Sequence, residues 1–257
     1  MAPRSLWNGT IAFGAVAVPI KMYTAAEPGT VHFHEVHLED GARIEHRRFC
    51  SKEGREVPRD EVVRGYEIRP GEYVVVDKDE ADAAGGERSR IIDIEHFVDA
   101  TAIDPVFFDH PYFLGAGKAG GDAYRLLHDA MATANRAAIG RFTFHNREYV
   151  VAIRPYDDVL ALHTLRFADE LVDAGELDVP AARRTPDERE IKMAGALVES
   201  LHEDFDPNAY HDEYRELVLE AIKAKAKGKD ITMEQPEPRG ESDDLLAALQ
   251  ASLEGAR

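Results

Sequence analysis

Residues 31–57 have no apolar face, and this stretch most strongly limits how the chain can fold. VHFHEVHL at 31–38 begins with the alternation of a β-strand, Asp40-Gly41 is a strong hairpin-turn signal, and RIEHRRF at 43–49 has the pattern of a returning strand. Because both faces are largely polar, this segment cannot be an ordinary core hairpin. We therefore predict a long polar β-ribbon over residues 31–57, called the ribbon below.

Most other segments before residue 171 have the patterns of β-strands. Residues 5–24 predict two short strands that break at Gly14, with Pro19 at an edge. Residues 88–99 predict a strand with Ile91 and Phe97 available for burial. The remaining β-like segments are 61–68, 72–77, 104–114, a hairpin over 139–155 with its turn at His145-Asn146, and 159–171. The fold class is therefore mixed and mainly β.

Residues 121–138 have the apolar spacing of an amphipathic helix. The positions predicted to share its buried face are Tyr124, Leu127, Ala130, Met131 and Ala134. DKDEADAA at 77–84 predicts another, shorter helix.

The pattern is helical after residue 184. Thr185 is the predicted N-cap of a helix, with Pro186 at its first position and Glu188 at its third. The predicted apolar stripe of this helix is Ile191, Ala194, Leu197, Val198 and Leu201. A second helix follows FDPNAY and is predicted to end at Gly228.

The last segment combines a Pro/Glu-rich linker at 230–241 with a short helix that begins at Ser242. Its apolar residues are Leu245, Leu246, Leu249 and Leu253. A short helix on a linker cannot bury four leucines by itself. These leucines either dock a partner or pack back on the body of the protein.

Charge is distributed unevenly along the chain. With 49 acidic and 31 basic residues the formal net charge is −18, which by itself argues against a nucleic-acid partner. Residues 43–64, however, carry seven basic and five acidic side chains, and residues 136–166 carry five and three. Residues 168–220 carry 16 acidic and 5 basic ones. A basic surface in the first two-thirds of the chain is therefore compatible with the total.

The sequence predicts a soluble, cytoplasmic protein. No apolar run approaches the roughly 18 residues of a membrane span, and MAPRSLWNGT lacks the apolar stretch of a secretory signal. Cys50 is the one cysteine, so no intrachain disulfide can form.

GAGKAG at 115–120 matches the G-x-G-x-x-G pattern of dinucleotide-binding loops and supports a rival hypothesis, a nucleotide-dependent enzyme. That pattern belongs to a parallel βαβ unit, whereas residues 139–153 predict an antiparallel hairpin. Asn135 and Arg136 stand where an acidic residue is expected, and Pro111 interrupts the preceding strand. A plain glycine loop is favoured, and no cofactor is predicted.

His32, His34 and His37 are the candidates for a metal site, but no cysteine pair lies nearby. Exposed strand histidines are the favoured interpretation, so no metal is predicted. No G-x-S-x-G, H-E-x-x-H or P-loop pattern occurs, and we predict no catalytic residue and no enzyme activity.

Several stretches in order resemble the prokaryotic Ku proteins, the DNA-end-binding factors of non-homologous end joining. They are SLWNGTIAFGAVAVPIKMY, VPRDEVVRGYE, ERSRIIDIEHFVD, IDPVFFDHPYFL, LALHTLRFADEL and FDPNAYHDEYRE, and they span about residues 4–228. The resemblance implies a β-barrel core, a bridge-forming insertion and a helical arm that wraps a second subunit. It implies a ring-shaped homodimer that threads onto a duplex end and recruits and stimulates an ATP-dependent DNA ligase of the ligase D type in double-strand break repair. A location at the nucleoid follows from the same resemblance.

The domain boundaries that we expect are a core at 1–175 that includes the ribbon, a dimerisation arm at 176–228, and an acidic tail at 229–257. Ring proteins hold DNA through its phosphates. The candidate DNA-binding residues are Arg43, Arg47, Arg48, Lys52, Arg55, Arg88, Arg90, Arg141, Arg147 and Arg154. The candidate dimer-interface residues are Leu197, Leu201, Tyr210, Tyr214 and Leu217. Resemblance to the family makes the four leucines of the last helix candidates for ligase docking.

Two features depart from the family pattern. Some members have a Cys-x-x-Cys pair where this chain has CSKEG, so Glu53 stands in place of the second thiolate. Many members end in a lysine-rich tail, whereas residues 229–257 are acidic, and extra DNA contacts from the tail are not expected. A scaffold role unrelated to DNA is the non-enzyme alternative.

Overall fold

The computed structural model describes residues 3–77, 80, 90–118, 120–144, 147–179 and 184–228. The chain divides into two compact units, Met1–Pro28 with His34–Ala174, and Gly29–Phe33 with Gly175–Arg257. Most of the helix predicted at 77–84 lies outside the described residues, as do the His145-Asn146 turn and the last helix.

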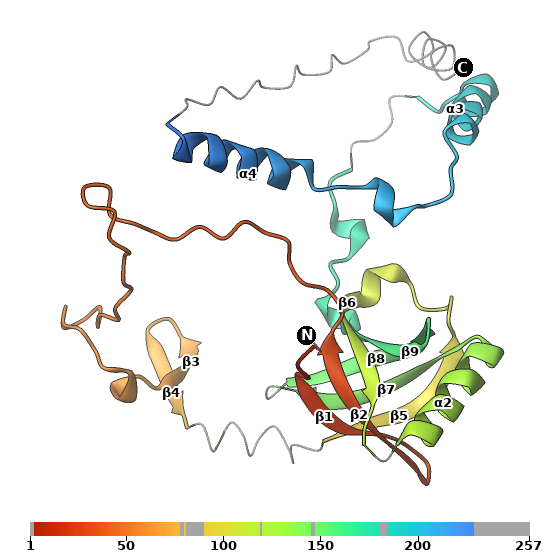
Figure 1. The fold of residues 1–257 in the computed structure, drawn as a ribbon, viewed down its shortest axis with the longest axis horizontal. Helices are drawn as coiled ribbons and strands as arrows, with labels where there is room; N and C mark the ends of the chain where they lie inside the picture. Colours follow the sequence, from red (N-terminus) through yellow and green to blue (C-terminus); the bar gives the residue numbers. More distant parts are fainter. Residues whose placement is uncertain are drawn as a thin grey trace. The chain divides into compact units, whose positions relative to one another are not determined.

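The first unit contains a closed β-barrel (Figure 1). Its strands in spatial order are β1 (Trp7–Phe13), β2 (Val16–Thr24), β6 (Phe108–Ala116), β9 (Val159–Leu165), β8 (Arg147–Tyr156), β7 (Arg136–Phe144) and β5 (Ile91–Asp99). Neighbouring described strands are antiparallel except β1 and β5, which pair in parallel and close the barrel. The break predicted at Gly14 is confirmed, because Gly14 turns between β1 and β2 with φ +55°.

Alternate residues of the strands fill the barrel, as the period of two requires. Fully buried side chains include Ile11, Val18, Met22, Leu114, Val151, Ile153, Leu160 and Leu162. Burying each such side chain contributes about 1.5–3 kcal/mol, so these residues hold the barrel together. On β5 the buried residues are Ile92 and Ile94, neighbours of the two residues singled out from the sequence, whereas Ile91 and Phe97 themselves are about two-fifths exposed.

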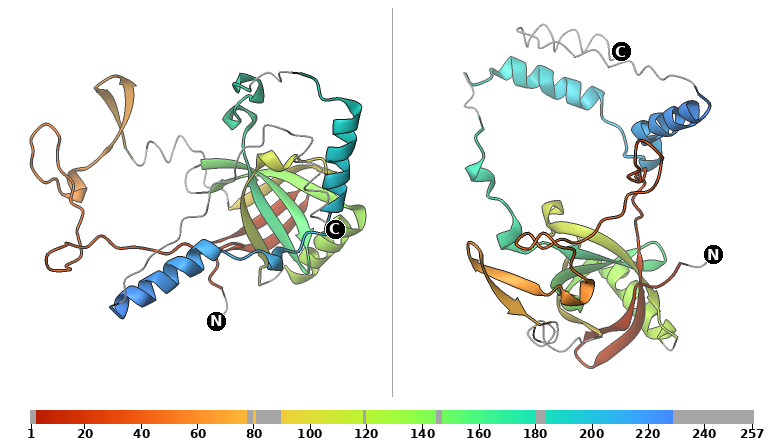
Figure 2. Two further views of the ribbon diagram at one scale, coloured as in Figure 1. Left: turned by 90° about the horizontal axis from the view of Figure 1, so that it is seen from above. Right: turned by 90° about the vertical axis from the view of Figure 1, so that its left-hand side faces the viewer.

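Helix α2 (Gly121–Ala134) closes one end of the barrel (Figure 2). It contacts β2 as well as β7 and β8, and β2 lies across the barrel from the other two strands. Tyr124, Leu127 and Met131 are buried as predicted. The helix ends earlier than predicted because Asn135 takes a left-handed conformation with φ 51°.

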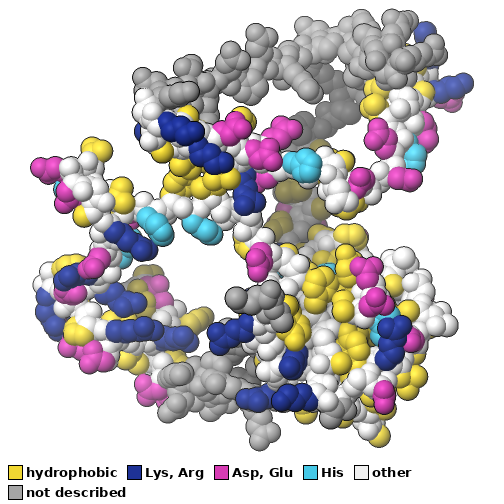
Figure 3. Space-filling view, viewed as in Figure 1, with side chains coloured by type: hydrophobic (Ala, Val, Ile, Leu, Met, Phe, Trp, Pro, Cys, Tyr) yellow, Lys and Arg dark blue, Asp and Glu magenta, His cyan; other side chains and the backbone are white. Residues whose placement is uncertain are grey.

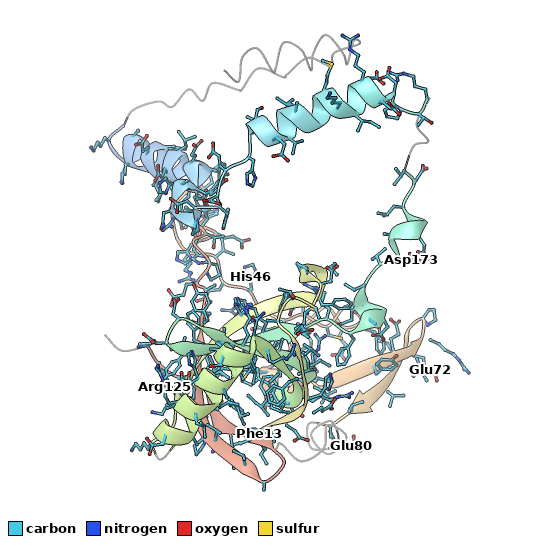
Figure 4. The ribbon with its side chains drawn as sticks, turned by 90° about the vertical axis from the view of Figure 1, so that its right-hand side faces the viewer. Phe13, His46, Glu72, Glu80, Arg125 and Asp173 are labelled. Carbon is cyan, nitrogen blue, oxygen red and sulfur yellow. The ribbon has the colours of Figure 1, made fainter. Side chains whose placement is uncertain are left out.

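The buried face of α2 differs from the prediction in one respect. Ala130 and Ala134 are exposed, and His128 is buried instead. The ring nitrogens of His128 lie 2.8 Å from Asp129 Oδ1 and 2.9 Å from the Asp157 carbonyl oxygen, so this side chain ties α2 to the turn between β8 and β9. Arg125, labelled on α2 in Figure 4, is exposed and pairs with Asp129.

The hydroxyl group of Tyr124 joins α2 to the end of the β6–β9 ladder. It donates a hydrogen bond to the Leu114 carbonyl and accepts one from the Leu160 N–H at 2.8 Å. Leu114 and Leu160 form the last β6–β9 pair, so the hydroxyl satisfies backbone groups that are enclosed there.

The ribbon forms hairpin turns without a continuous ladder. Isolated bridges join Val36 to Arg43 and Phe49 to Glu56. The Asp40-Gly41 turn is confirmed, with Gly41 at φ +71° and the Ala42 N–H bonded to Asp40 Oδ1 at 2.9 Å. Its neighbour is the turn at 50–55, where the Cys50 N–H bonds to the Arg55 carbonyl at 2.9 Å. After the ribbon, β3 (Arg64–Arg69) and β4 (Glu72–Val76) form a two-stranded sheet.

The second unit contains α3 (Glu188–Ser200) and α4 (Glu213–Ala226). The predicted N-cap at Thr185 was wrong by two residues. Asp187 caps α3 in a reciprocal box with Glu190, whose carboxylate also accepts a two-pronged pair from Arg184. The end predicted at Gly228 is confirmed, because Gly228 follows the last turn of α4 with φ +74°.

We expect Tyr124→Phe to lower the free energy of unfolding by about 1–3 kcal/mol, because it leaves a buried carbonyl and a buried N–H unpaired. Urea unfolding measures this change. Tyr66→Phe is the matched control, since Tyr66 is 71% exposed on β3. Equal stability of the two variants would contradict the structural role of the Tyr124 hydroxyl.

We also expect stability to depend on pH through Glu190. The Arg184 guanidinium, together with the Asp187 backbone N–H, lowers the pKa of Glu190 from 4.5 to about 2. A depressed folded pKa means that the ionised carboxylate stabilises α3 above pH 4.5, and that this stabilisation is lost as the pH falls toward 2. Glu190→Gln should lower the helical circular dichroism at pH 7 and flatten its loss between pH 4.5 and 2. Glu188→Gln, on the same turn, should leave the profile unchanged.

Candidate nucleic-acid interface

The predicted DNA-binding residues of the ribbon are all exposed, and they fall into two groups. Arg43, Arg48 and Lys52 form no ion pair within the described part of the chain. Arg47 and Arg55 are each held by two glutamates. Figure 3 shows basic side chains (dark blue) beside acidic ones (magenta) in this part of the molecule, which is the segment drawn in orange in Figure 1.

Arg47 uses both terminal nitrogens of its guanidinium group. Nη1 lies 3.1 Å from Glu56 Oε2, and Nη2 lies 3.7 Å from Glu45 Oε2. The hydrogen bond and charge of Glu56 raise the pKa of Arg47 further above its ordinary value. Both terminal nitrogens of the Arg47 guanidinium group therefore already lie beside a glutamate carboxylate.

Arg55 is held in the same way. Its Nε lies 2.5 Å from Glu53 Oε2, and its Nη2 lies 3.4 Å from Glu61 Oε2. Glu53 is the residue that stands in place of a second thiolate after Cys50, so in this chain that position supplies a partner for arginine. Among the described residues, no group of three potential metal ligands comes together.

The three candidate DNA-binding arginines of the β7–β8 hairpin do not all lie on one face of the sheet. Arg141 pairs opposite Val150, so it lies on the same face of the sheet as Arg154, whereas Arg147 has the opposite parity on β8. Arg141 is paired with Glu95 at 2.9 Å, and Arg147 with Glu170 at 2.5 Å. The strand period of two separates these residues.

Arg154 is the member of this hairpin for which the described residues supply no acidic partner. Its guanidinium carbon lies 5.7 Å from the centre of the Tyr156 ring. Arg90 is exposed just before β5, and Arg88 lies outside the described residues.

The predicted dimer residues of the second unit are largely exposed in the single chain. Leu201, Tyr210, Tyr214 and Leu217 have exposed fractions between 58% and 76%, and Leu197 is half-buried. The prediction missed Phe205, which is 79% exposed and stacks on Tyr210 with the ring centres 5.7 Å apart. The apolar Phe205 within the acidic HEDFD stretch was the available signal. The four leucines predicted to dock a partner lie outside the described residues.

The glycine loop at 115–120 packs against β2. The Gly117 N–H donates to the Pro19 carbonyl at 2.8 Å, and a Cβ on Gly117 would lie 2.9 Å from Pro19 Cβ. A Cβ on Gly120 would lie 2.9 Å from the Pro19 carbonyl oxygen. The glycines are needed for close approach to this strand, and β7, which follows α2, pairs antiparallel to β5. The structure therefore gives no support to a dinucleotide loop.

We expect Gly117→Ala to lower the free energy of unfolding by about 1–3 kcal/mol, because the added methyl group overpacks against Pro19. Gly121→Ala is the matched control, since a Cβ there meets no atom within 4 Å, and it should be neutral or stabilising. Chemical denaturation compares the two. Unchanged stability of Gly117→Ala combined with lost nucleotide binding would instead favour a cofactor loop.

Comparison with known proteins identifies relatives of this chain. The family described as the Ku70/Ku80 beta-barrel domain matches residues 12–193. A Non-homologous end joining protein Ku of Anaeromyxobacter sp. (strain K) is 44% identical over 99% of this chain and 86% of its own length. Proteins with the same name from Solibacter usitatus and Mycobacterium tuberculosis are 37% and 36% identical, over 98% and 97% of this chain and 93% and 94% of their own lengths. None of the helices among the described residues is long and apolar enough to cross a membrane.

Proposed function

The chain belongs to the Ku family of non-homologous end joining proteins, and on this basis we propose that it binds double-stranded DNA ends without sequence preference as a ring-shaped homodimer. The protein is thus a DNA-binding factor of double-strand break repair. In this proposal it has no catalytic activity, and it recruits and stimulates an ATP-dependent DNA ligase that joins the strands.

The observation that carries the proposal is the group Arg43, Arg48 and Lys52 on the exposed ribbon. These side chains have no acidic partner among the described residues, so they are available to phosphate oxygens. Phosphate contacts position a protein on a duplex but carry no sequence information. Each contact releases condensed counterions, so binding should weaken steeply with salt.

Dimerisation through the second unit is supported by its exposed apolar residues. Several large aromatic and aliphatic side chains that are exposed in the single chain are typical of an interaction surface. Tyr210, Tyr214 and Leu217 are members of that set. We assign them to the homodimer because the family resemblance implies an arm that wraps a second subunit.

The acidic charge of residues 168–220 is consistent with an arm that contacts a second subunit and not DNA. An acidic arm repels DNA, so the favourable contacts are confined to the basic part of the ribbon. The ligase contact is assigned to the leucines at 245–253, on the resemblance alone.

We expect only linear DNA to compete for the complex with a linear duplex, because a closed ring loads at an end. A gel-shift assay with excess linear or closed-circular competitor tests this. The triple variant Arg43→Gln, Arg48→Gln, Lys52→Gln should bind at least tenfold more weakly. Because each residue occurs twice in the homodimer, the slope of log K against log salt should be up to about 5.4 units shallower. Equal competition by circular DNA would contradict the ring.

A variant of the arm separates the ring from simple phosphate affinity. Tyr210→Ser with Tyr214→Ser should be monomeric in sedimentation and should lose the preference for linear competitor. If this variant is monomeric and keeps the preference, the arm does not build the ring.

A further inference from the structure

Two arginines of the ribbon are paired with glutamates, three of which lie in the ribbon and one, Glu61, just after it. Arg47 faces Glu45 and Glu56, and Arg55 faces Glu53 and Glu61. A guanidinium binds phosphate through a fork of parallel N–H donors, which is the same geometry that binds carboxylate. On Arg55 the carboxylates occupy the Nε and Nη2 donors of one edge, and on Arg47 they occupy both terminal nitrogens. A phosphate that uses these same donors must displace a glutamate, and one that uses the remaining N–H groups still lies beside two carboxylates that weaken its binding.

These ion pairs are weak enough to exchange. The side chains of Arg47, Glu56, Arg55 and Glu61 are between 50% and 59% exposed. Exposed pairs of this kind are worth about 0–1 kcal/mol each. The glutamates therefore reduce the affinity of the arginines for phosphate without abolishing it.

We propose that these four glutamates are internal competitors for DNA phosphate, which leave Arg43, Arg48 and Lys52 to make the ribbon's stronger phosphate contacts. This inference rests on the proposed function and assigns the regulation of the same surface. The ribbon holds DNA less tightly than its number of basic residues suggests. The competition also lowers the salt dependence, because an arginine that stays with glutamate releases no counterion from DNA.

The sharpest test is a double-mutant cycle on Arg47 in the full-length chain. Arg47→Gln is made in the wild type and in the Glu45→Gln, Glu56→Gln background, and binding to a short linear duplex is measured across a salt series. We expect Arg47→Gln to reduce the salt slope by about 1.8 in the glutamine background, about 0.9 for each protomer of the homodimer, and by much less in the wild type. The glutamine background itself should bind about two- to tenfold more tightly, the effect of releasing two exposed pairs.

Two controls separate pairing from charge. Arg43→Gln should have the same effect in both backgrounds, because neither glutamate contacts Arg43. Glu39→Gln removes a charge from the same ribbon without freeing an arginine, and it should leave the salt slope unchanged.

The outcomes distinguish this inference from the proposed function. If the wild type binds linear DNA and Arg47→Gln has equal effects in both backgrounds, the glutamates do not compete and the inference fails alone. An increase in affinity from Glu39→Gln equal to that of the paired glutamates would also overturn it. If the wild type does not bind DNA ends at any salt concentration, the proposed function fails and the inference fails with it.

Discussion

Parallel pairing of β1 with β5 is the contact on which the rest of the first unit depends. The chain leaves the barrel after Thr24 and rejoins it at β5, where the Thr10 N–H bonds to the Arg90 carbonyl at 2.8 Å. Gly9 makes this approach possible, because a Cβ there would lie 2.5 Å from that carbonyl oxygen. Both ends of a 66-residue excursion with little core of its own are thereby fixed to a well-packed barrel.

Period and turn chemistry predicted the barrel strands and the turn at Gly14, but they did not decide which residues of β5 are buried. On β5 the choice between Ile92 and Ile91 depends on pairing with β1 and β7, and a one-residue change of register exchanges the two faces. The cap of α3 was misplaced for a similar reason. Thr185 and Asp187 both satisfy the capping rule, and the ion pair from Arg184 to Glu190, six residues along the chain, favours the second.

The sequence predicted which basic residues belong to the candidate site, but it did not predict which of them form ion pairs. The local excess of arginine and lysine in an otherwise acidic chain predicted the ribbon as the basic surface. Whether Arg55 is free depends on Glu53 and on Glu61, which is six residues away and lies in the 3-10 turn Arg59–Glu61. The β7–β8 arginines illustrate the same limit, since strand parity and not sequence proximity sorted Arg141 from Arg147.

The lack of buried side chains in the ribbon has a consequence for how this protein can change. Substitutions in the barrel interior alter folding and function together, because its residues are packed on every side. The described residues at 34–56 include no buried side chain, so charge reversals there leave the barrel interior untouched. Under the proposed function, affinity for DNA and thermodynamic stability are thus separable traits in this chain. Substitutions in the ribbon, whether selected or engineered, can therefore change DNA affinity while the stability of the barrel stays constant.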